Sequence, residues 1–335
     1  MSFQNAKTLV LDYYSALDDA GPDGAGSVME RFLSADVIWR GFHPFGEING
    51  NPAGIGKTVW SPLKTSLTRM QRRMDIFFAG KNSLSDENDG SVWVASMGHL
   101  MGLFDVPLFG IRPTGKIGML RYCEFLRVEG NRITEIAFYF DLPHLMDQAG
   151  QNPFPPQTAA QLVQPGPMTH TGLLYDAQDP NEGVETLAAI NRMISDLGQW
   201  DHPLSLEEEL ALTWHDDMLW WGPTGIGASY TIERYAKQHS GPFRAAFANR
   251  SGTGHICRMA EGEYGGFFGW PNFTATHTGG FMGLPASDKT LEFRVIDLYR
   301  RSGNKLAENW IFIDLLHFMK QQGADVLERN TITSL

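Results

Sequence analysis

The sequence predicts an α+β protein that contains two copies of one domain. Residues 121–150 and 294–323 are identical at eleven of thirty positions, at a constant offset of 173 and without a gap. In each half, stretches with helical spacing of apolar residues come first and alternating, strand-like stretches follow. Hydrophobic residues make up 42% of the chain and charged residues 19%, as in globular domains. Self-similarity of this kind indicates a repeated structural unit.

Helices are predicted at the start of each copy. Helical patterns occupy 3–17, 26–33 and 52–67 in the first copy, and 182–197, 204–214 and 229–248 in the second. Ser205, with Glu208 three residues later, forms a capping-box pattern that marks a helix start.

Strands are predicted to fill the rest of each copy. Alternating stretches lie at 91–101, 116–128 and 133–140, and again at 291–300 and 305–313. Gly/Asn connections join the last two stretches of each copy, which indicates hairpins. Asp141 and Asp314 follow the last strands and are predicted to cap short terminal helices. We expect two curved antiparallel sheets, each forming a cone with its helices around an apolar pocket.

The predicted domain boundaries follow from the repeat. The first domain spans 1–150 and the second spans 181–325, with a linker at 151–180 between them. The linker is rich in proline, which stiffens a chain and removes backbone donors. We expect the copies to form a pseudo-dimer within one chain, present as a monomer or a homodimer.

Composition excludes several classes of protein. A net charge of −11 disfavours nucleic acid and anionic membrane surfaces as partners. The one dense basic cluster, Arg69, Arg72 and Arg73, is interpreted as a solvated face. No stretch reaches the roughly 20 apolar residues of a membrane span, and the start of the chain lacks a signal-peptide pattern. Cys123 and Cys257 suggest no disulfide framework, so we expect a cytoplasmic protein.

The order of motifs resembles the SnoaL-like polyketide cyclase family of the NTF2-like superfamily. The shared motifs are Asp-x-x-Trp, Arg-x-x-(Asp/Glu)-x-x-Arg, Gly-Asn-(Arg/Lys)-(Ile/Leu)-x-Glu and a terminal Asp-Leu. The resemblance covers 12–150 and 182–323, so this chain looks like two such domains in tandem. It implies an acid–base enzyme without a cofactor, of cyclase, isomerase or dehydratase type, that acts on a small hydrophobic carbonyl compound.

Two carboxylates are the candidate acid–base groups. Glu124 and Asp297 occupy equivalent positions within strands. Strand alternation puts each acid on the face opposite the preceding arginine, Arg121 or Arg294. A carboxyl group that points into an apolar cavity can move protons near neutral pH because burial raises its pKa. A structural carboxylate bound across the sheet is the alternative.

Two histidines are candidate partners of these carboxylates. The resemblance implies that His99 and His277 act as donors or proton carriers, and the two are paired as equivalents. A hydrogen-bonded core histidine is the alternative for both.

Further residues are predicted to line the pockets. In the second copy, polar and aromatic residues gather on predicted strand and helix faces, which favours that copy as the site. The pocket candidates are Trp221, His239, His255, Glu261, Trp270, Tyr299, Glu308 and Trp310 in the second copy, and Trp39, Trp60, Trp93 and Tyr122 in the first.

Neither a metal site nor a cofactor is predicted. The histidines show no spacing typical of metal ligands, and no dinucleotide or phosphate-loop motif occurs. A binding protein without catalysis, holding an apolar ligand in the cone, remains the second hypothesis. A third is that the first copy is inactive and only supports the second.

Overall fold

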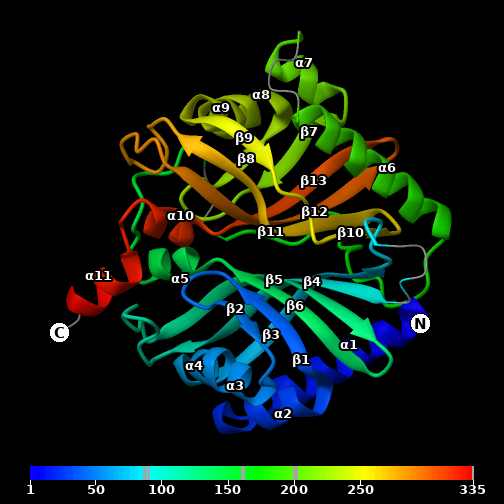
Figure 1. Cartoon of the computed structure of the whole chain (residues 1–335), viewed down its shortest axis with the longest axis vertical. Helices are drawn as coiled ribbons and strands as arrows, with labels where there is room; N and C mark the ends of the chain where they lie inside the picture. Colours follow the sequence, from blue (N-terminus) through cyan, green and yellow to red (C-terminus); the bar gives the residue numbers. More distant parts are fainter. Residues whose placement is uncertain (86–88, 90, 160–162, 199–202, 334–335) are drawn as a thin grey trace. The chain divides into compact units, whose positions relative to one another are not determined.

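The computed structural model describes residues 1–85, 89, 91–159, 163–198 and 203–333, and the chain divides into two compact units (Figure 1). Unit 1 comprises Met1–Pro153, His170–Ala177 and Asp314–Leu335, and unit 2 comprises Phe154–Thr169 and Gln178–Ile313. The predicted linker thus contributes residues to both units. The helix that ends the second copy belongs to unit 1.

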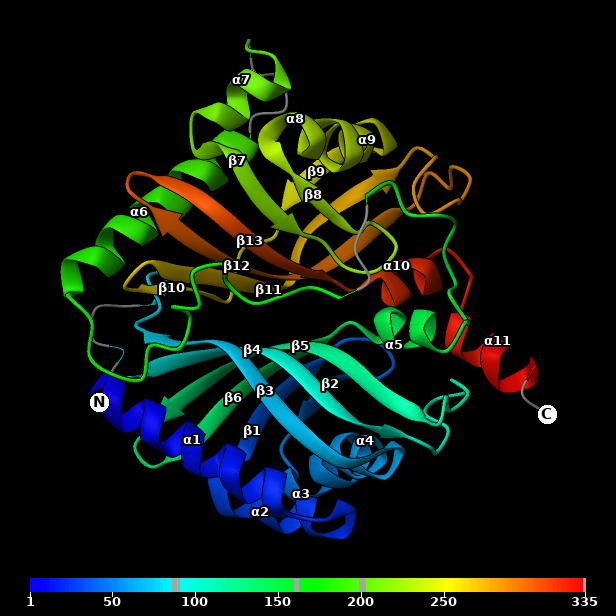
Figure 2. The same ribbon diagram turned by 180° about the vertical axis from the view of Figure 1, so that it is seen from behind.

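Unit 1 places helices on one face of a curved six-stranded sheet, which confirms the α+β class. Helix α1 runs across this face, as seen from behind in Figure 2. The helical elements are α1 (Phe3–Asp19), η1 (Pro22–Gly24), α2 (Ala25–Phe32), α3 (Pro52–Ile55), η2 (Gly56–Trp60), α4 (Ser61–Ser66), α5 (Leu142–Gln148), α10 (Leu315–Gln321) and α11 (Val326–Thr333). The strands are β1 (Leu33–Gly41), β2 (Gly46–Asn49), β3 (Leu67–Gly80), β4 (Val92–Phe104), β5 (Lys116–Glu129) and β6 (Arg132–Phe140), in the order β2-β1-β6-β5-β4-β3.

Unit 2 repeats this plan with a seven-stranded sheet. Its helical elements are α6 (Pro180–Leu197), α7 (Leu206–Ala211), α8 (Thr231–Tyr235), η3 (Ala236–Ser240) and α9 (Gly241–Ala246). Its strands are β7 (Trp214–Trp221), β8 (Ala228–Tyr230), β9 (Phe247–Gly252), β10 (Cys257–Glu261), β11 (Tyr264–His277), β12 (Thr290–Ser302) and β13 (Lys305–Ile313). The order is β10-β11-β12-β13-β7-β8, and β9 also pairs with β11.

Both sheets are mixed, whereas the sequence led us to expect antiparallel sheets. Strands β1 and β6 run parallel, and so do β7 and β13, while the other pairs are antiparallel. A parallel pair needs a long crossover between its strands. In each unit, most of the domain lies in sequence between the two parallel strands.

The edge of the sheet differs between the units. In unit 1, β3 is one strand of 14 residues. In unit 2 its place is taken by β9 and β10, which both pair with β11 and are separated by residues 253–256. Gly254 in this break has φ of +103°, a conformation that residues with a Cβ rarely adopt.

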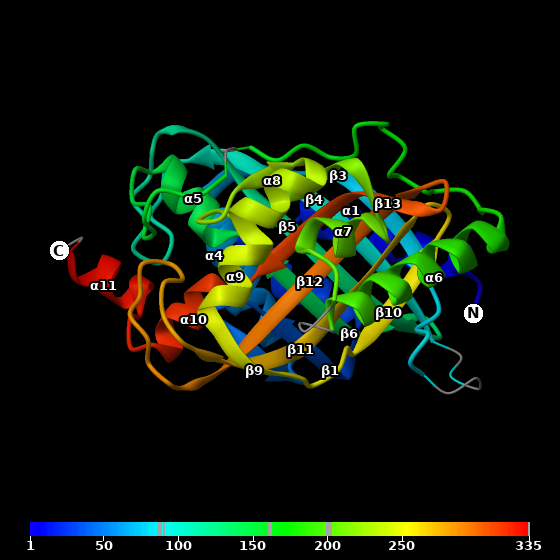
Figure 3. The ribbon, with the colours of Figure 1, turned by 90° about the horizontal axis from the view of Figure 1, so that it is seen from above.

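A hydrogen bond and close packing hold α6 against the sheet of unit 2. In the view of Figure 3, α6 and α9 lie on either side of β12. Arg301 on β12 donates to Thr186 Oγ1 on α6 at 2.9 Å. Helix α6 also passes close to Gly265, where a Cβ would lie 2.7 Å from Ile190 Cδ1. Ser205 and Glu208 form the predicted capping box of α7.

The short helices after the last strands are capped as predicted. Asp141 accepts a hydrogen bond from His144 N–H, and Asp314 accepts one from His317 N–H. Within the described residues, no helix is both long enough and apolar enough to cross a lipid bilayer.

Candidate active site in unit 2

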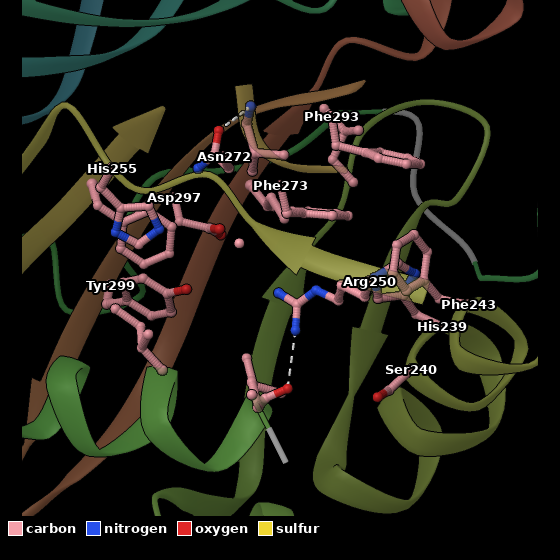
Figure 4. Close-up of a pocket in the computed structure, with 18 of the residues that line it drawn as sticks. His239, Ser240, Phe243, Arg250, His255, Asn272, Phe273, Phe293, Asp297 and Tyr299 are labelled. Atoms are coloured by element: carbon pink, nitrogen blue, oxygen red, sulfur yellow. Dashed lines mark hydrogen bonds between the residues drawn. The ribbon is translucent and has the colours of Figure 1, made fainter. Parts of the chain in front are cut away.

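A cavity of about 580 Å³ lies between the helices and the sheet of unit 2 (Figure 4). Helices α6, α8 and α9 with η3, and strands β9, β10, β11, β12 and β13, contribute to its wall. Its exposed lining residues are Gly198, Arg250, Gly252 and Gly254, so the mouth lies beside the break between β9 and β10. The volume falls within the range of small-molecule sites.

Asp297 is the carboxylate of this wall, on the strand face that the alternation predicts. Phe293, Val295 and Tyr299 share the face and also line the cavity. Asp297 is 6% exposed, and its Oδ1 accepts a hydrogen bond from Asn309 Nδ2 at 3.0 Å. A hydrogen bond also joins it to Tyr299. The side chain is therefore held in place while it faces the cavity.

Uncharged donors lie around the carboxylate. Burial and the charge of Asp297 raise the pKa values of Tyr235 and Tyr299, so both phenols keep their protons at neutral pH. Asn272 is 6% exposed, and its Oδ1 accepts from Val295 N–H at 2.8 Å. This bond fixes the amide, and its buried Nδ2 is a donor with no hydrogen-bond partner.

Two of the predicted histidines also line the cavity, and both are neutral. Burial lowers the pKa of His239 to about 3, and its ring stacks on Trp220 at 4.2 Å between centroids. Burial and the nearby Arg258 and Arg250 lower the pKa of His255 to about 3. His255 stacks on Phe267, with 4.0 Å between ring centroids. Neither imidazole is protonated near neutral pH, so both serve as walls or as acceptors.

His277 is not a partner of Asp297, contrary to the prediction. Its backbone N–H donates to the carbonyl oxygen of Lys289, which directly precedes β12 and lies eight residues before Asp297. At about 3.3 Å per residue, the two positions are about 25 Å apart along the sheet. The pairing of His277 with His99 is also wrong, because the register makes Phe104 the equivalent of His277. His277 pairs with Phe247 on β9, as Phe104 pairs with Leu67 on β3.

Most of the other predicted pocket residues of unit 2 lie outside the cavity. Residues paired across strands share a sheet face, and these belong to the face opposite Asp297. Trp310 pairs with both Leu298 and Trp221, and Glu308 pairs with Arg300. Glu261 pairs with Tyr264, which pairs with Arg300 and so lies on the same far face.

Three of these residues have other roles. Trp310 donates to Pro165 O at 3.0 Å, and Glu308 accepts from Met168 N–H at 3.0 Å. Trp270 lies in the irregular stretch of β11 between Gly269 and Phe273, where the Arg294 guanidinium covers its ring at 3.8 Å.

The interior of unit 1 is filled by its own side chains. The Glu124 position is equivalent to Asp297, and Glu124 is fully buried. Tyr14 donates to Glu124 Oε2 at 2.7 Å, while Oε1 has no hydrogen-bond partner. Around it pack the predicted aromatic residues Trp39, Trp60 and Tyr122, at most 2% exposed.

The remaining candidates of unit 1 face away from Glu124. His99 pairs with Arg121 and Trp93 pairs with Arg127, on the opposite face of the sheet. His99 Nδ1 lies 3.6 Å from Asp75 Oδ2, and its ring stands edge-on to His144. His99 therefore cannot exchange a proton with Glu124 directly.

Arg72 is buried inside unit 1 rather than on a solvated face as predicted. Its side chain is 2% exposed, and its guanidinium carbon lies 3.9 Å from the ring centroid of Tyr14. Trp60 and Tyr122 lie 5.3 and 5.1 Å from it. The guanidinium also contacts Asp18 at 3.3 Å and Glu124 at 3.8 Å.

Two substitutions between the units explain why one interior is hollow. Trp60 ends η2 just as Ser240 ends η3, and Ser240 lines the cavity. Arg72 pairs with Leu100 at the register position where Gly252 pairs with Phe273. The indole and guanidinium that fill unit 1 are thus replaced by a hydroxymethyl group and a hydrogen atom in unit 2.

Burial makes Glu124 a source of pH-dependent stability. It raises the pKa of Glu124 from 4.5 to about 7, against the opposing effects of Arg72 and Tyr14. Below pH 4.5 the carboxyl is neutral in both states, and between 4.5 and 7 it ionises only in the unfolded chain. The free energy of unfolding therefore falls by about 3 kcal/mol as the pH rises from 4.5 to 7.

We expect Glu124→Gln to lack this loss. The free energy of unfolding of the variant, relative to wild type, should rise by about 3 kcal/mol between pH 4.5 and 7.5. Urea unfolding at several pH values measures the difference. A constant difference across this range would show that Glu124 ionises normally in the fold.

Several site residues escaped the sequence analysis. Asn272 and Arg250 carry no motif, and each depends on an irregularity: the distorted stretch of β11 for Asn272 and the interrupted edge strand for Arg250. For Ser240 a signal exists in the sequence: "WSPL" at 60–63 aligns with "SGPF" at 240–243, which puts Ser240 at the position of Trp60. Among the described residues, no group of three His, Cys, Asp or Glu side chains is placed to hold a metal ion.

The fold and the cavity define a class of protein: an α+β domain whose pocket holds a carboxylate among aromatic side chains, polar donors and arginines. Residues 270–322 match the family model described as SnoaL-like polyketide cyclase, which confirms the resemblance predicted from the motifs. The matched stretch contains Asn272, Asp297, Tyr299 and Asn309.

Solved structures similar to this chain cover less than half of it. An NTF2-like protein from Burkholderia xenovorans is 15% identical and covers 41% of this chain and 95% of its own, with a TM-score of 0.33. An NTF2-like protein from Burkholderia thailandensis is 20% identical over 45% and 99%, with a TM-score of 0.31. IdmH from Streptomyces antibioticus, a predicted polyketide cyclase, is 16% identical over 42% and 99%, with a TM-score of 0.34. No curated protein matches the chain.

Proposed function

We propose that unit 2 is an acid–base catalyst of the polyketide-cyclase type, which acts without a cofactor on a small hydrophobic carbonyl compound. The observation that carries this proposal is Asp297, a carboxylate held by Asn309 and Tyr299 in the wall of an accessible cavity. A positioned carboxylate that faces an apolar pocket is suited to take a proton from carbon.

The chemistry follows from the neighbours of Asp297. Its carboxylate takes a proton from the carbon next to the substrate carbonyl, and the electrons of the broken C–H bond form an enolate. The Nδ2 group of Asn272 and the phenol of Tyr235 are the donors for the enolate oxygen. In a ring closure the enolate carbon attacks a second carbonyl of the same molecule, and Asp297 returns its proton to the alkoxide.

Unit 1 is assigned no catalysis in this proposal. Glu124 has the right position in the strand, but Trp60 and Arg72 occupy the space that a substrate would need. We propose that this copy supports the fold and that the two copies form a pseudo-dimer within the chain.

A binding protein without catalysis is the alternative hypothesis. It predicts a carboxylate bound to the backbone, out of reach of other proton donors. Asp297 instead lies within hydrogen-bond reach of Tyr299, inside the cavity, which favours the enzyme.

Hydrogen–deuterium exchange of a neutral ketone whose ring is fused to a benzene ring tests the function without knowledge of the natural substrate. The full chain is incubated with 2-tetralone in D₂O, and NMR follows loss of the protons beside the carbonyl. We expect exchange faster than in buffer with an equal amount of heat-denatured protein. Exchange at the buffer rate would count against acid–base catalysis on ketones.

Filling the cavity should abolish the same activity. Ser240→Trp places in unit 2 the side chain that fills unit 1, so we expect at least a roughly tenfold loss of catalysed exchange because the ketone is excluded. Trp60→Phe in unit 1 is the matched control and should retain exchange. Full activity of Ser240→Trp would place catalysis outside this cavity.

A further inference from the structure

Among the described residues that line the cavity of unit 2, three are arginines and one, Asp297, is a carboxylate. Arg244 forms two hydrogen bonds with Glu209, at 2.9 and 2.7 Å, so its charge is largely compensated. Arg258 donates to the uncharged groups Asn191 Oδ1 and His255 Nδ1. Arg250 donates to Leu197 O at 3.0 Å.

Arg250 stands at the entrance. The residue is exposed, and its guanidinium reaches into the cavity between the α6 side and Phe273 (Figure 4). The guanidinium carbon lies 4.7 Å from the ring centroid of Phe273. A guanidinium in this position can receive an anionic group as a ligand enters.

The comparison of the two units ties these cations to the open cavity. The register equivalent of Arg250 in unit 1 is Met70, and that of Arg258 is Phe77. Neither arginine is thus a general feature of the fold. Both occur in the unit whose interior is hollow.

The electrostatics agree with this comparison. Although Arg250 is partly exposed at the mouth, desolvation of its guanidinium and the neighbouring Arg244 lower its pKa; desolvation, followed by Arg258 and Arg250, lowers the pKa of His255. The smaller arginine contributions to both shifts reflect positive charge close to Arg250 and His255. Asp297 lies deeper, beside Tyr235 and Tyr299.

We propose that the substrate is an acidic aromatic compound whose carboxylate binds Arg250 and Arg258 while its carbonyl faces Asn272 and Asp297. This rests on the proposed function, because it names the substrate class of the same site. Phe243, Phe267, Phe273 and Phe293 supply the apolar wall for a planar ring system. The cationic mouth therefore orients the molecule, with the anion away from Asp297.

Two isosteric probes test the inference by binding alone. Isothermal titration calorimetry of the full chain compares 2-naphthoate with 2-naphthamide, which differ in charge but hardly in shape. We expect the naphthoate to bind about tenfold more tightly, a preference that shrinks as salt is added.

Variants assign the preference to residues. Arg250→Gln and Arg258→Gln should each reduce the preference several-fold without weakening naphthamide binding, and Arg250→Lys should keep most of it. Arg234→Gln, an exposed arginine of α8 outside the cavity, is the matched control and should behave as wild type.

The contrary outcomes are equally specific. Equal affinity for the two probes, an unchanged preference in both glutamine variants, or no binding of naphthoate at millimolar concentration would overturn the inference. Because 2-tetralone is neutral, its exchange tests the proposed function separately. A naphthoate preference without ketone exchange would sustain anion recognition and reject the catalytic role.

Discussion

Replacing Asp297 with asparagine is expected to lower the catalysed exchange of 2-tetralone by at least about 10²-fold. The amide cannot take a proton from carbon, and general acid–base catalysis contributes about 10²–10⁴-fold. The side chain keeps its size, and its oxygen can still accept from Asn309, so the fold should persist. Exchange rates by NMR and urea unfolding of the same preparation separate the two effects.

Glu124→Gln provides the matched control for this experiment, because Glu124 is the equivalent acid in the filled interior of unit 1. We expect it to retain the exchange activity of wild type. If instead Asp297→Asn exchanges at the wild-type rate, Asp297 is not the base. If Glu124→Gln alone loses activity, the catalytic unit has been assigned to the wrong copy.

Replacing Arg72 with methionine is expected to destabilise the protein by about 3 kcal/mol. The change leaves Glu124 and Asp18 without their buried counter-charge, and breaking a buried ion pair in this way typically costs 3–5 kcal/mol. It also removes a cation from the faces of Tyr14, Trp60 and Tyr122. Uptake of a proton by Glu124 limits the cost.

Urea unfolding followed by tryptophan fluorescence measures this effect. Arg73→Met is the matched control, since Arg73 is the next residue on β3 but its side chain is 59% exposed and paired with Asp75. We expect a change below about 1 kcal/mol there. Equal destabilisation by the two substitutions would mean that the buried charge of Arg72 contributes nothing special.

The α+β class and the twofold plan could be predicted from sequence because they depend on periodicity. The repeat at offset 173 and the alternating runs lie within the strands that build each sheet. The parallel pairing of β1 with β6 could not be predicted, since alternation records which face a side chain occupies and not the direction of the neighbouring strand.

The candidate site was predictable to the extent that it lies on one regular strand. Parity on β12 placed Asp297 and Tyr299 on the cavity face. Strand alternation does not apply to His255, which lines the cavity but precedes β10, since that strand begins at Cys257. Strand register along β11 decided the position of His277, and no local pattern in the sequence records register.

Because the edge of the unit 2 sheet is interrupted, the size of the cavity entrance can vary independently of the strand that carries Asp297. Strands β9 and β10 each pair with β11 by their own ladder, and the break between them is held to β11 by Thr253 N–H and Ile256 N–H, which donate to Asn272 O and Phe268 O. Insertions or deletions at 253–256 change the size of the cavity mouth, while β12, which carries Asp297, keeps its position in the sheet. Selection for larger or smaller molecules can therefore act on a four-residue loop, which includes the wall residue His255, while Asp297 stays on β12.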